Sequence, residues 1–258
     1  MTEVARGPFD LRERLAAVRR RIEECALRSN RSPEEITLIA VSKTHPAETV
    51  ERAIAAGVRE LGENRVQEAE DKIRELGRER ARWHLIGHLQ ANKARRAVQL
   101  FDLIHSVDSS ALVNRLERLC ADEGRAELPV LIQVDLAGEE TKSGVSMEEL
   151  PLIVESVTAC ERLRLDGLMT LPPFFETAER VRPYFQRLRE LRDAISSRNG
   201  FGAGRGELSM GMSHDYHIAI EEGATMVRVG TSIFGERQKS KDEGGRRKDE
   251  VKIKETAQ

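Results

Sequence analysis

The feature that most constrains this sequence is a repeated alternation of short apolar runs with longer segments in which apolar residues recur at helical spacing. Helices between strands return the chain to the same end of a sheet, so this pattern is typical of parallel strands. Eight runs qualify as strands, and a substantial helix is expected after seven of them. The predicted strands span residues 36–43, 58–64, 83–88, 102–107, 128–136, 163–171, 207–211 and 226–231.

The segments between these runs carry signals of helix start and end. Ser109 and Ser213 stand where helix N-caps are expected. Ser146 with Glu149 fits a capping box, and Pro183 predicts a kink or an irregular start. Helices are predicted at residues 9–28, 47–56, 66–76, 91–100, 109–123, 146–159, 176–197 and 213–222.

Eight strand–helix units in 258 residues predict the α/β class and a single (β/α)8 barrel of the TIM type. The extra N-terminal helix would cover the place where an eighth outer helix is missing. A doubly wound open sheet is the alternative, although no G-x-G-x-x-G follows the first strand. We expect residues 1–237 to form the barrel. Residues 238–258 are charged and nearly free of large apolar side chains, so we expect a disordered tail there.

Composition and charge exclude several classes of protein. The net charge of −2 gives no electrostatic case for nucleic acid or an anionic membrane as the partner. No apolar run approaches the roughly 18 residues of a membrane span, and the N-terminus lacks the hydrophobic core of a signal peptide. Three cysteines, Cys25, Cys120 and Cys160, without a C-x-x-C pair argue for a reducing compartment. We therefore expect a cytoplasmic protein.

The first predicted strand ends in a lysine. Alternate side chains of a strand share a face, which puts Ile39, Val41 and Lys43 on one side, with Lys43 at the C-terminal end. Pro46 suits the first turn of the helix that follows. Lys43 is therefore a candidate reactive amine. Taken by itself, the segment favours a simpler interpretation, a solvated lysine just past a buried strand.

The other strand ends also carry polar residues. A barrel gathers its functional groups at the C-terminal ends of its strands, where polar side chains would converge on one mouth and form a ligand site. Asp108 and Asp135 are more often helix caps or loop anchors, so we assign them no chemistry. The strand ends are occupied in order by Lys43, Asn64, His88, Asp108, Asp135, Met169, Gly211 and Arg228 with Gly230.

The last two strands lead into glycine-containing segments, SMGMS at 209–213 and RVGTSIFG at 228–235. Glycine lets backbone N–H groups approach a ligand closely, and hydroxyl groups add donors. Barrels often bind phosphate at the loops after strands seven and eight. Either segment alone is explained as well by a tight turn with a serine cap, but both together favour a phosphate site.

An amine on strand one and a phosphate site on strands seven and eight would lie on neighbouring walls of a closed barrel. A phosphorylated aldehyde fits this pair, with its carbonyl on the amine as a Schiff base and its phosphate on the loops. Pyridoxal 5'-phosphate (PLP) is the obvious candidate cofactor.

Several segments resemble the pyridoxal phosphate homeostasis protein family, in matching order over about residues 11–237. The resemblance implies a single-domain, fold-type III PLP barrel similar to the N-terminal domain of alanine racemase. It also implies that the cofactor is held as a Schiff base on Lys43. The segments are AVSKT at 40–44, GENRVQE at 62–68, WHLIGHLQANK at 83–93, GLMT at 167–170, SMGMS at 209–213 and VGTSIFG at 229–235.

The same resemblance implies the remaining contacts. Asn64 and Met169 would line the cofactor, and Arg228 would lie near its pyridine nitrogen or its phosphate. Phosphate contacts would fall to Ser209, Ser213, Gly230 and Thr231. With the neighbouring strand-end positions, the expected cofactor-binding residues are Lys43, Asn64, His88, Met169, Ser209, Met210, Gly211, Ser213, Arg228, Gly230 and Thr231.

The family resemblance implies a carrier of PLP rather than an established enzyme. We expect a monomer that buffers PLP or delivers it to PLP-accepting apo-enzymes, in vitamin B6 and amino-acid homeostasis. The alternative is a PLP-dependent amino-acid racemase or lyase, and a third class is a module that binds PLP without covalent chemistry. The only tyrosines, Tyr184 and Tyr216, fall in helical segments, whereas an alanine racemase places a catalytic tyrosine opposite its lysine.

Two histidine pairs are candidate metal ligands by their spacing. His84 and His88 have i, i+4 spacing but lie in a strand pattern, and His214 with His217 has no evident third ligand, so no metal is expected. Glu63 is interpreted as a structural carboxylate.

Overall fold

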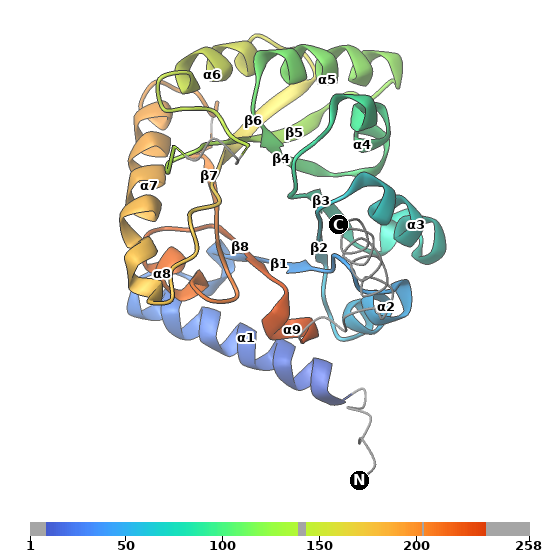
Figure 1. Ribbon diagram of the computed structural model, residues 1–258, viewed down its shortest axis with the longest axis vertical. Coiled ribbons are helices and arrows are strands. Elements are labelled where there is room, and N and C mark those ends of the chain that lie inside the picture. The colour runs from blue at the N-terminus through green and yellow to red at the C-terminus, as the bar shows by residue number, and fades with distance from the viewer. Residues whose placement is uncertain (1–8, 139–142, 203, 236–258) are drawn as a thin grey trace, which may run out of the picture.

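Residues 9–138, 143–202 and 204–235 are described by a computed structural model of the chain. Within them, eight parallel strands pair in sequence order, and β8 pairs with β1 to close a barrel (Figure 1). This closure confirms the (β/α)8 barrel and rules out an open doubly wound sheet. The expected tail, residues 238–258, lies outside the described residues. The strands are β1 Thr37–Val41, β2 Glu60–Glu63, β3 Arg82–Leu85, β4 Leu103–Val107, β5 Leu128–Gln133, β6 Leu163–Met169, β7 Glu207–Met212 and β8 Met226–Val229.

Helices surround the barrel as an outer ring (Figure 1). The helix that precedes β1 lies along the last two helices of the ring, α8 and α9, which confirms its expected covering role. None of the helices in the described part of the chain is long and apolar enough to cross a membrane. The helices are α1 Phe9–Arg28, α2 Ala47–Ala55, α3 Val66–Leu76, α4 Ala94–Leu100, α5 Ser110–Asp122, α6 Leu150–Thr158, α7 Arg182–Ser196, α8 Tyr216–Glu221 and α9 Thr231–Phe234.

Apolar side chains fill two separate zones. The larger zone lies between the strands and the outer helices, and every second residue of a strand such as Ala40 or Leu61 contributes to it. The smaller zone is a cluster of Leu103, Leu131 and Met169 that comes from β4, β5 and β6. Because neighbouring strand residues point to opposite faces, this second cluster fills the interior of the barrel.

All strands except β7 are shorter than their apolar runs predicted. Lys43, Asn64 and His88 were expected at strand ends, but β1, β2 and β3 stop one to three residues before them. These residues therefore belong to the loops that follow the strands. Loops at the C-terminal face of a barrel carry its functional groups, so the shorter strands favour a site there.

The predicted helix ends agree with the structure within two residues, whereas α4, α6, α7 and α8 start three to six residues later than predicted. Ser109 caps α5 by accepting a hydrogen bond from the N–H of Leu112. Pro183 lies in the first turn of α7, after a 3₁₀ turn at Ala178–Val181, so the irregular start is confirmed. The cap assigned to Ser213 is wrong: the N-cap of α8 is Asp215, because the chain makes an additional turn before the helix begins.

The capping box predicted at Ser146 and Glu149 is also present. The N–H of Glu149 donates to Ser146 Oγ, and the N–H of Ser146 donates to Glu149 Oε2. The regular helix α6 starts only at Leu150, one residue beyond the box.

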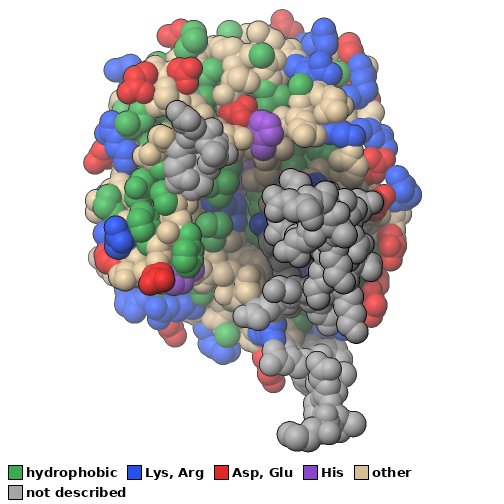
Figure 2. All heavy atoms as spheres, viewed as in Figure 1, with side chains coloured by type: hydrophobic (Ala, Val, Ile, Leu, Met, Phe, Trp, Pro, Cys, Tyr) green, Lys and Arg blue, Asp and Glu red, His purple; other side chains and the backbone are tan. Residues whose placement is uncertain are grey.

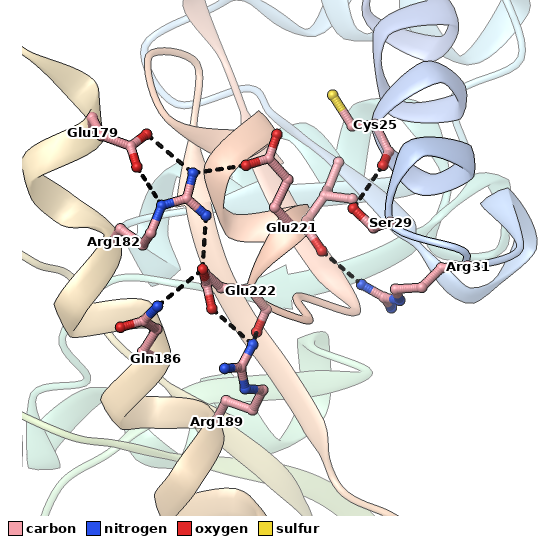
Figure 3. Close-up of polar contacts among 10 residues, drawn as sticks. Cys25, Ser29, Arg31, Glu179, Arg182, Gln186, Arg189, Glu221 and Glu222 are labelled. Atoms are coloured by element: carbon pink, nitrogen blue, oxygen red, sulfur yellow. Dashed lines mark hydrogen bonds and ion pairs between the residues drawn. The ribbon is translucent and has the colours of Figure 1, made fainter.

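An ion-pair cluster fastens α7 to α8 (Figure 3). Arg182 on α7 reaches Glu221 and Glu222, each at 2.7 Å. Glu222 is 7% exposed, and its other carboxylate oxygen pairs with Arg189 at 2.7 Å. Beside it, Arg31 donates to the carbonyl oxygens of Ile220 and Ala224 and so ties the end of α1 to α8. Removing a nearly buried carboxylate that two arginines share costs more stability than breaking an exposed pair.

We predict that Glu222→Ala lowers the free energy of unfolding by about 2 kcal/mol, because both arginines lose their shared partner. Glu190→Ala on α7 is the matched control. Among the described residues, Glu190 pairs with Arg187 alone, and both side chains are about half exposed, so the expected change is within about 0.5 kcal/mol. Urea denaturation of the three proteins measures the difference. Equal losses in the two variants would contradict this assignment.

Candidate functional site

The candidate residues gather at one end of the barrel because all strands are parallel. Lys43 follows β1, Asn64 follows β2, and Gly230 follows β8, which is hydrogen-bonded to β1. Lys43, Asn64 and Gly230 are half-buried. In a view along the barrel, the surface is hollowed near its centre and basic side chains are visible inside the hollow (Figure 2).

The residues on both sides of Lys43 are held by a charged cluster. Ser42 donates from Oγ to Glu63 Oε1 at 2.6 Å, and its carbonyl oxygen accepts from Lys72 Nζ at 2.7 Å. Lys72 also pairs with Glu63 at 2.6 Å and with Glu68 at 2.9 Å. The N–H of Thr44 donates to the same oxygen of Glu68. The backbone before and after Lys43 is therefore fixed to β2 and α3.

This cluster is buried and electrostatically coupled. Ser42 and Glu63 have no exposed surface, and Lys72 is 5% exposed. Burial raises the pKa of the Glu63 carboxyl, whereas the charge of Lys72 and the hydrogen bonds from Lys72 and Ser42 oppose that rise. Thr44 has a φ of +67°, in the left-handed region that residues other than glycine rarely adopt. The contacts of the cluster hold this backbone in place and agree with a structural role for Glu63.

The loops after β7 and β8 are joined through Ser213. Its Oγ accepts hydrogen bonds from the N–H groups of Gly230 at 3.2 Å and Ser232 at 3.4 Å. Gly211 has a φ of +90°, and a Cβ there would lie 2.6 Å from the Cβ of Ala219, so this position near the end of β7 requires glycine. The serine predicted to cap a helix therefore connects the two loops expected to bind phosphate.

The loop after β1 meets these two loops directly. The rings of His45 and Phe234 stack with centroids 4.9 Å apart. A Cβ on Gly230 would lie 3.2 Å from the carbonyl oxygen of Val41, so the backbones of β1 and the last loop are in close contact. Among the described residues, the backbone N–H groups of Ser213 and Thr231 donate to no protein acceptor. Such donors, next to serine and threonine hydroxyls, suit an anion.

Arg228 lies below this mouth, in the barrel interior, and is 3% exposed. Its Nη1 donates to Ser209 Oγ at 2.6 Å, and its Nη2 donates to the carbonyl oxygen of Thr170 at 2.8 Å. Burial lowers the pKa of Arg228 to about 10, opposed by the negative charge of Asp215. A pKa of about 10 still leaves Arg228 as a cation at neutral pH.

The contacts of Ser209 continue across the barrel. Its Oγ lies 2.9 Å from His105 Nδ1, and His105 Nε2 lies 2.9 Å from His84 Nδ1. His84 Nε2 is 2.6 Å from Glu60 Oε2. His105 is fully buried, and that burial, followed by the electrostatic effects of His84 and Arg228, lowers its pKa well below the ordinary value.

The structure places the remaining predicted residues in several environments. Met169 lies in the interior cluster, whereas Met210 belongs to the core outside the barrel. His88 is exposed and its Nδ1 lies 3.1 Å from Asp108 Oδ2. The backbone of Asn64 lies against Gly87, where a Cβ would come within 2.4 Å of the Asn64 carbonyl oxygen. The structure therefore brings four of the predicted residues together at the mouth of the barrel: Lys43, Ser213, Gly230 and Thr231. Two more, Ser209 and Arg228, lie beneath them.

Sequence reasoning missed Lys72, His105 and Glu60 as part of this region. His105 and Glu60 carried a signal, because each is a polar residue at an inward-facing position of a short strand, next to an outward-facing apolar residue. Lys72 gave none, since a lysine in a charged amphipathic helix is ordinarily solvated. His84 was weighed only as a metal ligand, and no three His, Cys, Asp or Glu side chains of the described residues come together for a metal.

The arrangement can hold a phosphorylated carbonyl compound. Lys43 supplies an amine on one wall, and the loops after β7 and β8 supply hydroxyl and backbone donors on the adjacent wall. The buried positive charge of Arg228 beneath the mouth adds attraction for an anionic ligand.

Comparison with known proteins gives consistent matches. The sequence profile of the alanine racemase N-terminal domain matches residues 14–238. The pyridoxal phosphate homeostasis protein of Escherichia coli K12 is 45% identical over 238 residues, which cover 90% of this chain and 99% of that protein. The pyridoxal phosphate homeostasis protein of Aquifex aeolicus is 42% identical over 226 residues, which cover 88% of this chain and 98% of that protein.

Solved structures extend the comparison. PipY of Synechococcus elongatus with PLP bound is 42% identical, covers 87% of this chain and 100% of its own, and superposes with a TM-score of 0.72. Alanine racemase of Corynebacterium glutamicum is 18% identical with a TM-score of 0.58, and the match covers 85% of this chain and 60% of the racemase. This more distant likeness shows a shared fold.

We predict that Lys72→Met lowers the free energy of unfolding by about 3 kcal/mol and speeds amide hydrogen exchange at Thr44. The buried carboxylate of Glu63 would lose its positive partner. The double variant Lys72→Met/Glu63→Gln is the control, because it removes the unpaired charge and should recover part of the loss. Denaturant unfolding and hydrogen exchange measure both effects. A single variant as stable as the wild type would contradict the proposed role of the cluster.

The buried His105 predicts a pH dependence of stability. Below its ordinary pKa of 6.5, the unfolded chain binds a proton at His105 whereas the folded chain does not. The free energy of unfolding should therefore fall as pH drops from about 6.5 to 5, by up to roughly 1.4 kcal/mol per pH unit from this group. Urea midpoints of the wild type and of His105→Gln measure the difference in slope. Equal slopes would show that His105 takes up its proton in the folded state.

Proposed function

The chain belongs to the pyridoxal phosphate homeostasis protein family, built on the alanine racemase N-terminal domain, and from this premise we propose that it binds PLP at the mouth of its barrel. The observation that carries the proposal is the position of Lys43 beside the joined loops after β7 and β8. An amine and an anion site on adjacent walls match the aldehyde and the phosphate of PLP. The structure of PipY with PLP bound supports the same ligand.

In this proposal Lys43 holds the cofactor covalently through Nζ. The hydrogen bonds from the charged cluster to Ser42 and Thr44 fix the backbone from which this amine extends. This reduces the conformational entropy lost when the cofactor binds to Lys43. Bound to a lysine through its aldehyde, PLP supplies an electron sink for amino-acid chemistry. Lys43 would react as the neutral amine, whose nitrogen bonds to the aldehyde carbon while the carbonyl oxygen leaves as water.

The phosphate contacts are assigned to the loops after β7 and β8. Ser213, Gly230 and Thr231 are solvent-accessible there, and they offer hydroxyl and backbone N–H donors. Ser209 is fully buried and already bonded to Arg228, so we propose that it acts on the ligand through Arg228. Asn64, His88, Met169, Met210 and Gly211 complete the proposed lining, Met210 through its backbone because its side chain is in the outer core.

We further propose a carrier of PLP rather than a racemase. A racemase needs acid–base groups on both faces of the bound substrate, and a tyrosine opposite the lysine serves this role in alanine racemases. Tyr216 is 7% exposed and packs in the outer core at the start of α8, and Tyr184 lies on α7 against Phe175. Neither stands at the C-terminal end of a strand. A PLP-dependent racemase or lyase remains the alternative that activity assays test.

A carrier function has consequences for partners and location. We propose that PLP passes to apo-enzymes that accept it, and that the protein acts as a cytoplasmic monomer. The names of the relatives support a homeostatic role. All three cysteines are free thiols, and burial raises the pKa of Cys120 and of Cys160 to about 11, which leaves both as inert thiols suited to a reducing compartment.

We predict a yellow absorption band when PLP is added to the wild type and no such band in Lys43→Ala. Borohydride treatment should fix the cofactor on the peptide that contains residue 43, as mass spectrometry would show. Lys93→Ala is the matched control, because Lys93 lies in the turn after β3, outside the proposed site, and should keep the band.

The outcomes separate the alternatives. Absence of the band in the wild type at saturating PLP would refute the covalent proposal. PLP affinity that survives in Lys43→Ala without any band would indicate non-covalent binding. Amino-acid racemase activity that depends on Lys43 would replace the carrier with an enzyme.

A further inference from the structure

A chain of polar contacts crosses the barrel from its floor to its mouth. Glu60 is the first residue of β2, His84 and His105 are the third residues of β3 and β4, and Arg228 is level with Met212 at the end of β7. The contacts run from Glu60 through His84, His105 and Ser209 to Arg228, with distances of 2.6, 2.9, 2.9 and 2.6 Å. We call these five residues the interior chain.

The hydrogen positions of the interior chain follow from its two charged ends. Arg228 is only a donor, so Ser209 Oγ accepts from it and has its own hydrogen left to donate. That hydrogen goes to His105 Nδ1, which leaves the proton of neutral His105 on Nε2. His105 Nε2 then donates to His84 Nδ1, and His84 Nε2 donates to the Glu60 carboxylate. Every contact is satisfied with both imidazoles neutral.

The opposite direction fails at Ser209. If His84 donated from Nδ1, His105 would donate from its own Nδ1 into Ser209 Oγ. Ser209 would then receive donors from both His105 and Arg228, and its own hydrogen would have no acceptor within the interior chain. A buried polar group without a partner costs roughly 1–3 kcal/mol. The guanidinium at one end therefore fixes the tautomers of both histidines.

Packing alone does not require these polar groups. The rest of the barrel interior is filled by apolar side chains such as Leu103, Leu131 and Met169. Ser209 and His105 have no exposed surface, and His84 is 1% exposed. The free-energy cost of their desolvation is therefore offset only if every hydrogen bond is formed. Glu60 retains some exposure and also lies 3.5 Å from Arg82 on the floor.

We infer that Glu60, His84, His105 and Ser209 are positioning residues that form one directional hydrogen-bond chain and hold the Arg228 guanidinium in a fixed orientation beneath the mouth. The carboxylate at the floor balances the guanidinium charge across the barrel. The effect on the ligand rests on the proposed function, because Arg228 would present its remaining donors to the cofactor.

The first test measures tautomers in the protein without cofactor. In protein labelled with ¹⁵N-histidine, ring-nitrogen NMR signals distinguish protonated from unprotonated positions. We expect His84 and His105 to carry their protons on Nε2 at neutral pH. A proton on Nδ1 of either residue, or a doubly protonated ring, would overturn the inference. This result requires no variant and no bound PLP.

The second test asks whether the chain acts as a unit. Glu60→Leu removes the terminal acceptor, whereas Glu60→Gln keeps an acceptor and removes only the charge. We expect the ring signals of His105, which does not contact residue 60, to shift in Glu60→Leu and to stay close to wild type in Glu60→Gln. His217 on α8 lies outside the barrel, and its signals are the internal reference. Unchanged His105 signals in folded Glu60→Leu would show that the contacts are independent pairs.

The third measurement links the chain to the ligand. If Arg228 is held by the interior chain, Glu60→Leu should weaken PLP affinity by roughly tenfold, the equivalent of one charge-assisted hydrogen bond. His217→Gln should leave the affinity unchanged. Wild-type affinity in a Glu60→Leu protein with shifted His105 signals would overturn the positioning role. A wild-type protein that binds no PLP would refute the proposed function, while the tautomer measurement would still decide the interior chain.

Discussion

The pairing of β8 with β1 is the contact on which the rest of this molecule depends. Four residue pairs of these strands are in register, from Thr37 opposite Met226 to Ala40 opposite Val229. This pairing brings the loop that carries Lys43 against the loop that carries Gly230, although the two segments lie at opposite ends of the described chain. Without closure, the amine and the anion-binding loops would stand on the two edges of an open sheet. Closure also creates the interior in which Arg228 and Ser209 meet His105.

The site combines two kinds of support. Outside the barrel wall, the cluster of Glu63, Lys72 and Glu68 fixes the backbone around Lys43. Inside the wall, the interior chain holds Arg228. Both supports are buried ionic or polar networks, which rarely add to stability over apolar packing but do specify one arrangement of the groups they contain. A site built on such supports presents its residues at the mouth with little rearrangement.

Periodicity in the sequence was enough to predict the barrel, its element order and most helix boundaries, because each element buries one regular face. Lys43 and the two glycine-containing loops could be found because strand ends and glycine turns leave local signals. The contact of His105 with Ser209 could not, since it joins residues far apart in the sequence through the interior of a closed barrel. Ser213 was assigned to a helix cap because a serine before a helical pattern has the same local signature as a loop connector. The role of Lys72 depends on burial, which a charged helix pattern does not reveal.

The position of α1 also bears on how the chain reaches its folded state. This helix comes first in the sequence, yet it packs on α8 and α9, the last two helices (Figure 1). During synthesis its apolar face, with Leu15, Val18 and Ile22, lacks most of its native contacts until nearly the whole barrel has emerged from the ribosome. Nascent barrels therefore carry a largely uncovered amphipathic helix, a surface that chaperones recognise. Docking of α1 then becomes a late step of folding. It covers the side of the barrel at which β8 pairs with β1.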